Sequence, residues 1–251
     1  MNIDQSLLQF CLKHSDGTGL KEFGERPKEE WEWLKEALAN FESPGKKVQK
    51  LVEELRAATT AGDDEKTVFL LASLNEELED VDQAQVVANL GGLELLLALC
   101  RHPRRELQLP ALTAVQLCLK NNAPVKLKTK NLGGLPHLMH ILIDGTSNDL
   151  EVRGRALSAI SALIDFDRDL QDVFVSAGGV DVASNLLVPE NQEKLVFRAL
   201  FVLRWLLSNR PDLVKGFLGS KSLVEHLQRL KGSANVELNE IATDFYDLLK
   251  Q

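Results

Sequence analysis

The stretch Gly91-Gly92-Leu93 decides the fold of this sequence, because it recurs as Gly133-Gly134-Leu135 and as Gly178-Gly179-Val180. Each copy opens a run of apolar residues at helical spacing, and Gly219-Ser220-Lys221-Ser222-Leu223 is a degraded fourth copy. The first glycines of the four copies lie 42, 45 and 41 residues apart. Self-similarity at about 40–47 residues is typical of solenoids built from two- or three-helix repeats. The sequence therefore predicts an all-α solenoid of about four repeats.

A second landmark keeps the same period, since Ala111-Leu112, Ala156-Leu157 and Ala199-Leu200 lie 45 and 43 residues apart. In the third unit we expect helices over 151–164 and 170–176 and a longer one over 180–187. Each Gly-Gly pair suits a helix end, where one residue needs a positive φ, followed by a tight start of the next helix. Three regions follow: a flexible segment over 1–25, N-terminal helices over 26–80, and the repeat domain over 81–251, whose last helix caps the solenoid.

A helical repeat cannot bury its apolar face alone, so repeats stack and leave a long surface free for a partner. This architecture favours a binding protein. Two aromatic residues of one apolar helix, Phe201 and Trp205, are expected in the core. A capped solenoid is expected to be a monomer.

Composition excludes several classes of protein. Hydrophobic residues make up 44% and charged residues 26%, as in ordinary globular domains. No apolar run approaches the ~18–20 residues of a transmembrane helix, so no membrane partner is expected. The net charge is −8, with one lysine and nine acidic residues in 61–100, so no nucleic-acid partner is expected. Three cysteines at unpaired spacings and no leader-like N-terminus favour the cytosol, with the nucleus as a second compartment.

Signatures of catalysis are missing from the sequence. The Gly-Gly pairs follow no strand and precede no Gly-Lys-Ser/Thr, so they are not phosphate loops. His137 and His140 can share a helix face, but no acidic or thiol ligand stands in the same turn. No nucleophile elbow or Cys/His arrangement occurs. We expect no enzyme, no cofactor and no metal.

The repeats resemble armadillo repeats, and the chain resembles the armadillo-type nucleotide-exchange factors of the 70-kDa heat-shock chaperone, the Fes family. The resemblance rests on an N-terminal phrase, an acidic helix with tryptophans and four phrases in the repeats. These phrases are 7–18, Glu29–Trp33, Val81–Ala84 with Leu90–Leu93, Lys120–Asn122, Val152–Leu157 and Phe197–Leu200. The resemblance implies an armadillo-like, right-handed helical solenoid.

Members of the Fes family are not enzymes, and the resemblance implies the same here. Their curved domain grips one lobe of the nucleotide-binding domain of the chaperone and opens its cleft, so that ADP leaves and the client is then released. The resemblance assigns the grip to Asp82, Ala84 and Arg198, with Asn121, Asn122 and Arg153 on intervening repeats. It also implies that an extended N-terminal apolar segment, containing Leu7, Leu8, Phe10 and Leu12, competes for the client groove of the chaperone.

Structural alternatives stand beside each assignment. Ala84 is alternatively a close-packed helix contact, and the 7–12 segment is alternatively a helix docked on the domain. Arg153 and Arg198 are alternatively solvated or paired with Glu151 and Glu193. Asn121 and Asn122 are alternatively residues that only end a helix. Two other functions remain open: an armadillo peptide-binding scaffold or adaptor, and a catalytic helical-repeat protein such as a nucleic-acid repair enzyme.

Overall fold

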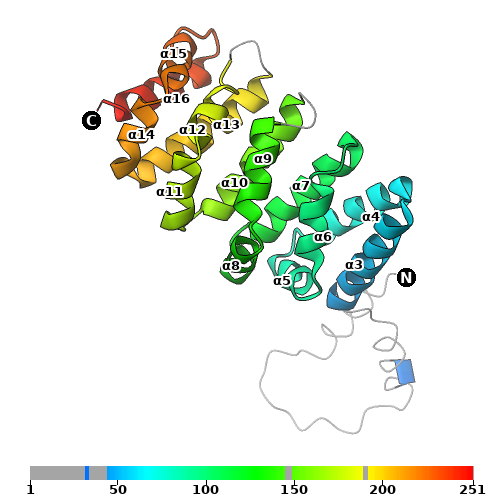
Figure 1. Cartoon of the computed structure of the whole chain (residues 1–251). Helices are drawn as coiled ribbons and strands as arrows, with labels where there is room; N and C mark the ends of the chain where they lie inside the picture. The colour runs from blue at the N-terminus through cyan, green and yellow to red at the C-terminus, as the bar shows by residue number, and fades with distance from the viewer. Residues whose placement is uncertain (1–31, 34–43, 145–148, 189–191, 251) are drawn as a thin grey trace, which may run out of the picture. The chain divides into compact units, whose positions relative to one another are not determined.

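A computed structural model describes residues 32–33, 44–144, 149–188 and 192–250 of the 251-residue chain (Figure 1). The chain divides into two compact units, Met1–Lys47 and Val48–Gln251, and the second contains the repeats. The predicted boundary at residue 80 falls inside this second unit. The predicted flexible segment 1–25, with Leu7, Leu8, Phe10 and Leu12, lies outside the described residues.

The described residues form helices and contain no strand, which confirms the all-α prediction. Among the helices whose bounds the structure describes, two come before four repeats, and each repeat holds a first, a second and a third helix. The leading pair is α3 (Pro44–Ala61) and α4 (Asp64–Glu77). The repeats are α5 (Val81–Asn89), α6 (Gly92–Leu99) and α7 (Arg105–Leu119); α8 (Ala123–Asn131), α9 (Gly134–Asp144) and α10 (Leu150–Ile164); α11 (Arg168–Ser176), α12 (Gly179–Ser184) and α13 (Glu193–Asn209); and η1 (Pro211–Leu213) with α14 (Val214–Leu218), α15 (Lys221–Leu230) and α16 (Val236–Leu248).

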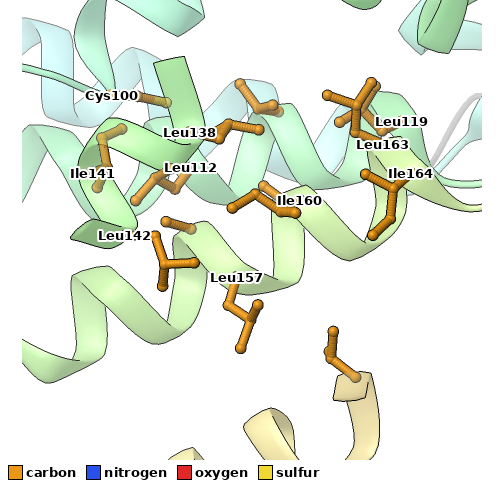
Figure 2. Close-up of a cluster of buried hydrophobic side chains, with 14 of the residues drawn as sticks. Cys100, Leu112, Leu119, Leu138, Ile141, Leu142, Leu157, Ile160, Leu163 and Ile164 are labelled. Atoms are coloured by element: carbon orange, nitrogen blue, oxygen red, sulfur yellow. The ribbon is translucent and has the colours of Figure 1, made fainter. Parts of the chain in front are cut away.

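The third helices carry the stack, because α4, α7, α10, α13 and α16 each pack against the next. One continuous set of buried apolar side chains runs from Val48 to Leu249. Figure 2 shows part of it, with Leu112, Leu138 and Ile160 meeting between α7, α9 and α10. Cys100 and Cys118 are free and buried in this core, where desolvation raises the pKa of the Cys118 thiol to about 12. None of the described helices is long and apolar enough to cross a membrane.

The first glycine of each Gly-Gly pair occupies the left-handed region, as expected. Gly91, Gly133 and Gly178 have φ values of 70°, 70° and 78°. Only glycine adopts this conformation without a steric cost, and here it turns the chain from the first helix of the repeat into the second. The degraded fourth copy has lost this feature, because Gly219 has a φ of −65° and Ser220 caps α15 instead.

The second glycine of each pair allows backbone contact between the first and second helices. A Cβ on Gly92 would lie 2.5 Å from Val87 Cγ1 and 2.9 Å from the Val87 carbonyl oxygen. A Cβ on Gly179 would lie 2.4 Å from the Phe174 ring and 2.6 Å from the Phe174 carbonyl oxygen. The pair therefore performs two separate tasks, a left-handed turn and a close helix approach.

One helix is shorter than the sequence suggests. The helix expected over 180–187 ends at Ser184, and only turn hydrogen bonds continue to Leu187. The Ser184 hydroxyl donates to the carbonyl oxygen of Asp181 at 2.7 Å, and Asn185 follows as the C-cap. Serine and asparagine compete with helical hydrogen bonds through their side chains, which explains the early end.

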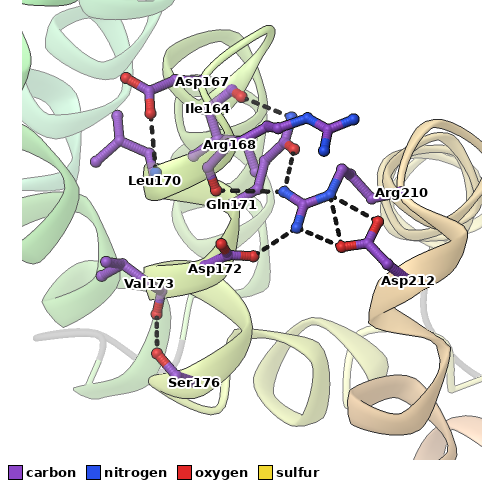
Figure 3. A network of polar contacts seen from close by, with 10 residues as sticks. All are labelled: Ile164, Asp167, Arg168, Leu170, Gln171, Asp172, Val173, Ser176, Arg210 and Asp212. Atoms are coloured by element: carbon purple, nitrogen blue, oxygen red, sulfur yellow. Dashed lines mark hydrogen bonds and ion pairs between the residues drawn. The ribbon is translucent and has the colours of Figure 1, made fainter.

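Polar contacts between residues about 40 positions apart in the sequence connect the turns of successive repeats. Asn122 caps α8 and donates from Nδ2 to the Val81 carbonyl oxygen at 3.3 Å, and Asp167 caps α11 and pairs with Lys130 at 2.7 Å. The corresponding place after α13 holds Arg210, which is 5% exposed. Figure 3 shows its guanidinium donating to Asp172 at 2.7 Å and to both carboxylate oxygens of Asp212.

We predict that Gly179→Ala lowers the free energy of unfolding by about 1–3 kcal/mol, because its Cβ would meet the backbone of α11. Urea denaturation measures the change. Gly219→Ala is the matched control: its Cβ would come no closer than 3.4 Å and its φ is ordinary, so its stability stays within about 1 kcal/mol of wild type. Gly133→Ala isolates the left-handed strain, about 1–2 kcal/mol, because no atom lies within 4 Å of its Cβ. Equal losses at 179 and 219 would contradict the close-approach explanation.

We also predict that Arg210→Met destabilises the chain by about 2 kcal/mol at pH 7, through loss of charge-assisted hydrogen bonds. Hydrogen bonds from Arg210 hold the pKa of the Asp212 carboxyl below its usual value. Their contribution is therefore present above about pH 4 and is lost as pH falls through the lowered pKa. The difference between the urea midpoints of wild type and variant should become smaller between pH 4 and pH 2, and the part due to the bonds from Arg210 to Gln171 and to the Arg168 carbonyl oxygen should remain. Exposed Arg229, changed to Met, is the control and should alter stability by less than about 0.5 kcal/mol.

Candidate partner-binding surface

The third helices run in the same direction, so their two ends define two edges of the stack. At one edge, the starts of α4 and α7 are joined by Asp64 and Arg104 at 2.7 Å, and Arg105 pairs with Asp149 and Glu151 at the start of α10. The opposite edge holds the turns into α5, α8 and α11 (Figure 1). A helix of 15 residues, such as α10, separates the edges by about 22 Å.

The structure places the six predicted contact residues in two groups. Asp82, Ala84, Asn121 and Asn122 belong to the edge of the first helices, where the bond from Asn122 to Val81 brings two repeats together. Arg153 and Arg198 lie near the starts of α10 and α13, at the other edge. One partner contacting both groups must span the whole width of the third helices.

Asp82 and Ala84 differ in accessibility. Asp82 stands exposed in the first turn of α5, and its backbone N–H donates to Asp80 Oδ1 at 3.0 Å. Ala84 is 0% exposed and belongs to the core. Its methyl group is therefore unavailable to a partner in this structure, which favours the alternative of a close-packed helix contact.

The two asparagines also differ in accessibility. Asn121 is exposed and has a φ of 54°, so it forms the left-handed turn after α7. Asn122 is 7% exposed, and both ends of its amide are engaged, Oδ1 accepting from Val125 N–H and Nδ2 donating to Val81. Asn122 begins α8 rather than ending α7, and its amide serves the fold. Of the pair, Asn121 is the residue whose side chain is exposed.

Arg153 faces the second helix of its own repeat. Its Nε donates to the carbonyl oxygen of Leu142 in α9 at 2.9 Å, and its half-burial lowers the pKa of the guanidinium. The predicted pairing of Arg153 with Glu151 is not among its contacts in the described residues. The neighbouring Arg155, two residues further along α10, is half-buried and lines a pocket with Arg198.

This pocket, which we call the basic pocket, lies between the starts of α7, α10 and α13 and has a volume of about 550 Å³. Four basic and two acidic side chains line it, so it carries a net charge of +2. They are Arg105, Arg155, Lys194 and Arg198, with Asp149 and Glu151. Sequence reasoning singled out Arg198 alone among these four cations.

Electrostatics distinguish Arg105 from the other two arginines of the basic pocket. Arg105 is bonded to Asp149 and Glu151, whose negative charges raise the pKa of its guanidinium. Arg198 is half-buried, and burial together with the nearby charge of Arg155 lowers its pKa. Within the described part of the chain, no carboxylate comes within the 4.0 Å of an ion pair from Arg155 or Arg198.

A second hollow, the aromatic groove, continues from the basic pocket along α13 and has a volume of about 470 Å³. It shares Lys194 and Arg198 with the basic pocket and is also lined by Phe197, Phe201 and Ile241. Phe201 is 62% exposed, so the expectation that it belongs to the core is wrong, whereas Trp205 is half-buried against the core.

Helical spacing explains why Phe201 is outside. Lys194, Phe197, Arg198 and Phe201 stand at i, i+3, i+4 and i+7 and form one stripe, while Leu195–Val196, Ala199–Leu200 and Val202–Leu203 form the buried stripe. The charged members of the outer stripe were the signal that its aromatic members are exposed too. Arginine with exposed aromatic rings is the composition of interface hot spots.

The basic pocket and the aromatic groove differ in the contacts that they offer. The described residues contain no group of three side chains able to hold a metal ion. The basic pocket offers guanidinium groups to an anion, and the aromatic groove offers apolar area beside them. Together they suit a protein partner with an acidic and an apolar patch.

Comparisons with known proteins connect this surface to a family. Residues 83–244 match the SIL1/FES1/HPBP1 C-terminal domain. A relative described as nucleotide exchange factor SIL1, from Xenopus laevis, is 24% identical over 176 residues, or 70% of this chain. The chain spans 38% of the length of that relative.

Solved structures share the fold. An engineered protein superposes with a TM-score of 0.68 at 23% identity, over 81% of this chain and 79% of its own. The armadillo repeats only protein of Plasmodium falciparum superposes with a TM-score of 0.64 at 17% identity, over 73% of this chain and 80% of its own. The family match includes α7, α10 and α13 and most of α16, the helices that build both hollows. Because the matched segment covers more than half of the 251 residues, the chain belongs to the SIL1/FES1/HPBP1 C-terminal domain family.

Proposed function

We propose that this chain is a co-chaperone that binds the nucleotide-binding domain of a 70-kDa heat-shock chaperone and promotes release of ADP, and thereby of the client. The observation that carries the proposal is the family match over 83–244, the segment whose third helices form the basic pocket and the aromatic groove. A relative that shares this segment is described as a nucleotide exchange factor.

The energetics of exchange set what this surface must do. A binding protein opens a cleft only through its higher affinity for the open state of the partner. By reciprocity, a factor that weakens ADP binding is itself weakened by ADP to the same degree. Lowering nucleotide affinity 100-fold requires about 2.7 kcal/mol of coupling. An interface of roughly 1,000–2,000 Å² with a few arginine or aromatic anchors has that capacity.

Two finer assignments belong to the same proposal. The apolar N-terminal segment with Leu7, Leu8, Phe10 and Leu12 has the composition needed to occupy a client groove in extended form. We place the protein in a reducing compartment, the cytosol, as a monomer; the free, buried thiols of Cys100 and Cys118 suit that placement.

The alternative is a peptide-binding armadillo scaffold, and the aromatic groove with exposed Phe201 is the feature that favours it. Regular peptide binders repeat asparagine and tryptophan along the groove. Here Asn121 belongs to the edge of the first helices, and Trp205 is half-buried, so these residues form no such series. An exchange factor accordingly fits the side chains better than a peptide scaffold.

We predict that the wild-type chain accelerates release of fluorescent ADP from a purified cytosolic 70-kDa chaperone, measured by stopped flow. Arg198→Met should reduce that effect by about tenfold or more, since it removes a central charged anchor. Arg101→Met, which removes an exposed arginine outside the hollows, is the matched control and should behave as wild type. Substitution of Ala84 is unsuitable as a test because a large side chain there would disrupt the core. No acceleration by wild type with several chaperones would overturn the proposal and favour the peptide scaffold.

We further predict that Phe201→Ala weakens binding to the nucleotide-binding domain by about tenfold, because an exposed aromatic anchor loses its contact area. Thermal unfolding should stay near wild type, since the ring is 62% exposed. Leu218→Ala is the control, because Leu218 is 51% exposed at the end of α14 and lines neither the basic pocket nor the aromatic groove. Equal binding by wild type and Phe201→Ala would remove the aromatic groove from the interface.

A further inference from the structure

Ion pairs join the starts of α4, α7 and α10, an amide–carboxylate hydrogen bond joins the starts of α13 and α16, and the step from α10 to α13 is different. Asp64 meets Arg104 between α4 and α7, and Arg105 meets Asp149 and Glu151 between α7 and α10. Between α13 and α16, Glu193 accepts from Asn235 at 3.2 Å. The step from α10 to α13 instead brings cations together, because Arg155 faces Lys194 and Arg198 across the basic pocket.

The backbone holds the arginines of this step in place. Gly154 lies in α10 beneath Arg198, and a Cβ there would be 3.1 Å from Arg198 Nη1 and 2.3 Å from Leu195 Cδ1. The missing side chain lets the Arg198 guanidinium rest close to α10, beside Arg155. The Nε atom of Arg155 is buried and has no hydrogen-bond partner among the described residues.

An unpartnered buried donor on a charged group is costly, because it has lost its water without gaining an acceptor. The acidic side chains close to this step already have partners: Asp149 and Glu151 bind Arg105, and Glu193 binds Asn235. Within the described part of the chain, Arg155 and Arg198 are therefore left without a carboxylate partner in the basic pocket. Two guanidinium groups side by side match the planar, two-oxygen geometry of a carboxylate.

We propose that the basic pocket is a receptor for one acidic side chain of the partner protein, whose carboxylate bridges Arg155 and Arg198. This assignment rests on the proposed function, which supplies a folded protein partner, and it adds Arg155 as a residue that determines specificity. Lys194, exposed at the rim, completes the positive field. A carboxylate is the source we choose because the surface of an unmodified folded protein offers no other fixed anion.

The test is a double-mutant cycle on binding to the purified nucleotide-binding domain, measured by isothermal titration calorimetry. Arg155→Met and Arg198→Met should each weaken binding by about 10- to 30-fold. Because both arginines hold the same carboxylate, the double variant should weaken binding by clearly less than the product of the two single effects. Arg155→Lys should also weaken binding, since it keeps the charge but loses the planar guanidinium that donates two hydrogen bonds to a carboxylate. Exposed Arg229→Met is the control and should bind as wild type.

The thermal stability of the Arg155→Met variant distinguishes a role of Arg155 in binding from a role in folding. Arg155→Met removes an unpartnered buried donor and a like charge beside Arg198, so the melting temperature of the free chain should stay the same or rise. A lower melting temperature, or binding equal to wild type, would overturn the assignment while leaving exchange by the wild type intact. A wild-type chain that does not bind the nucleotide-binding domain would overturn the proposed function and this assignment together.

Charge exchange tests the carboxylate itself. Arg155→Glu should abolish binding, and single Asp→Lys or Glu→Lys substitutions over the acidic surface of the nucleotide-binding domain should include one that restores it at least tenfold. Restoration by one position identifies the bound side chain. Failure of every position to restore binding would overturn the carboxylate receptor.

Discussion

The close approach of the first and second helices at each Gly-Gly pair is the constraint on which the repeat depends. A Cβ at Gly92, Gly134 or Gly179 would lie within 3 Å of a carbonyl oxygen of the preceding helix, so the two backbones are in contact there. This contact fixes how the two short helices meet, and they in turn support the long third helix. Where the fourth copy loses the pair, the first helix becomes a 3₁₀ turn with a five-residue α14, and a serine cap starts α15.

Contact within a repeat does not set the register between repeats. That register is set by polar contacts between residues about 40 positions apart in the sequence. Asn122, Asp167 and Arg210 occupy corresponding turns and reach back to the previous repeat with three different chemistries: an amide, a carboxylate and a guanidinium. These three turn positions therefore share a role, contact with the previous repeat, and do not share a residue type. Polar groups at these turns satisfy one another through hydrogen bonds and ion pairs, so buried members such as the Arg210 guanidinium keep partners inside the stack.

The stacking of third helices leaves one exposed stripe on each, and those stripes form the candidate surface. On α10 and α13 the stripes carry cations that the described part of the chain does not neutralise, beside an exposed phenylalanine. Packing alone would favour a pair of opposite charges at that step, as at the step from α7 to α10 before it. Because neighbouring like charges repel, an acidic side chain of a partner would stabilise this surface on binding. The arrangement of the helices is thus connected to recognition.

The sequence by itself determined the class and period of the fold. The Gly-Gly recurrence predicted left-handed turns at Gly91, Gly133 and Gly178, and backbone sterics are local enough for that inference to hold. The sequence also contained the resemblance to the family. Tertiary structure decided which side chains face outward. Ala84 is buried, Phe201 is exposed, and Arg155 rather than Arg153 accompanies Arg198. The physical reason is that a helix buries whichever stripe its neighbours cover, and the neighbours of α5, α10 and α13 include helices of adjacent repeats, about 40 residues away.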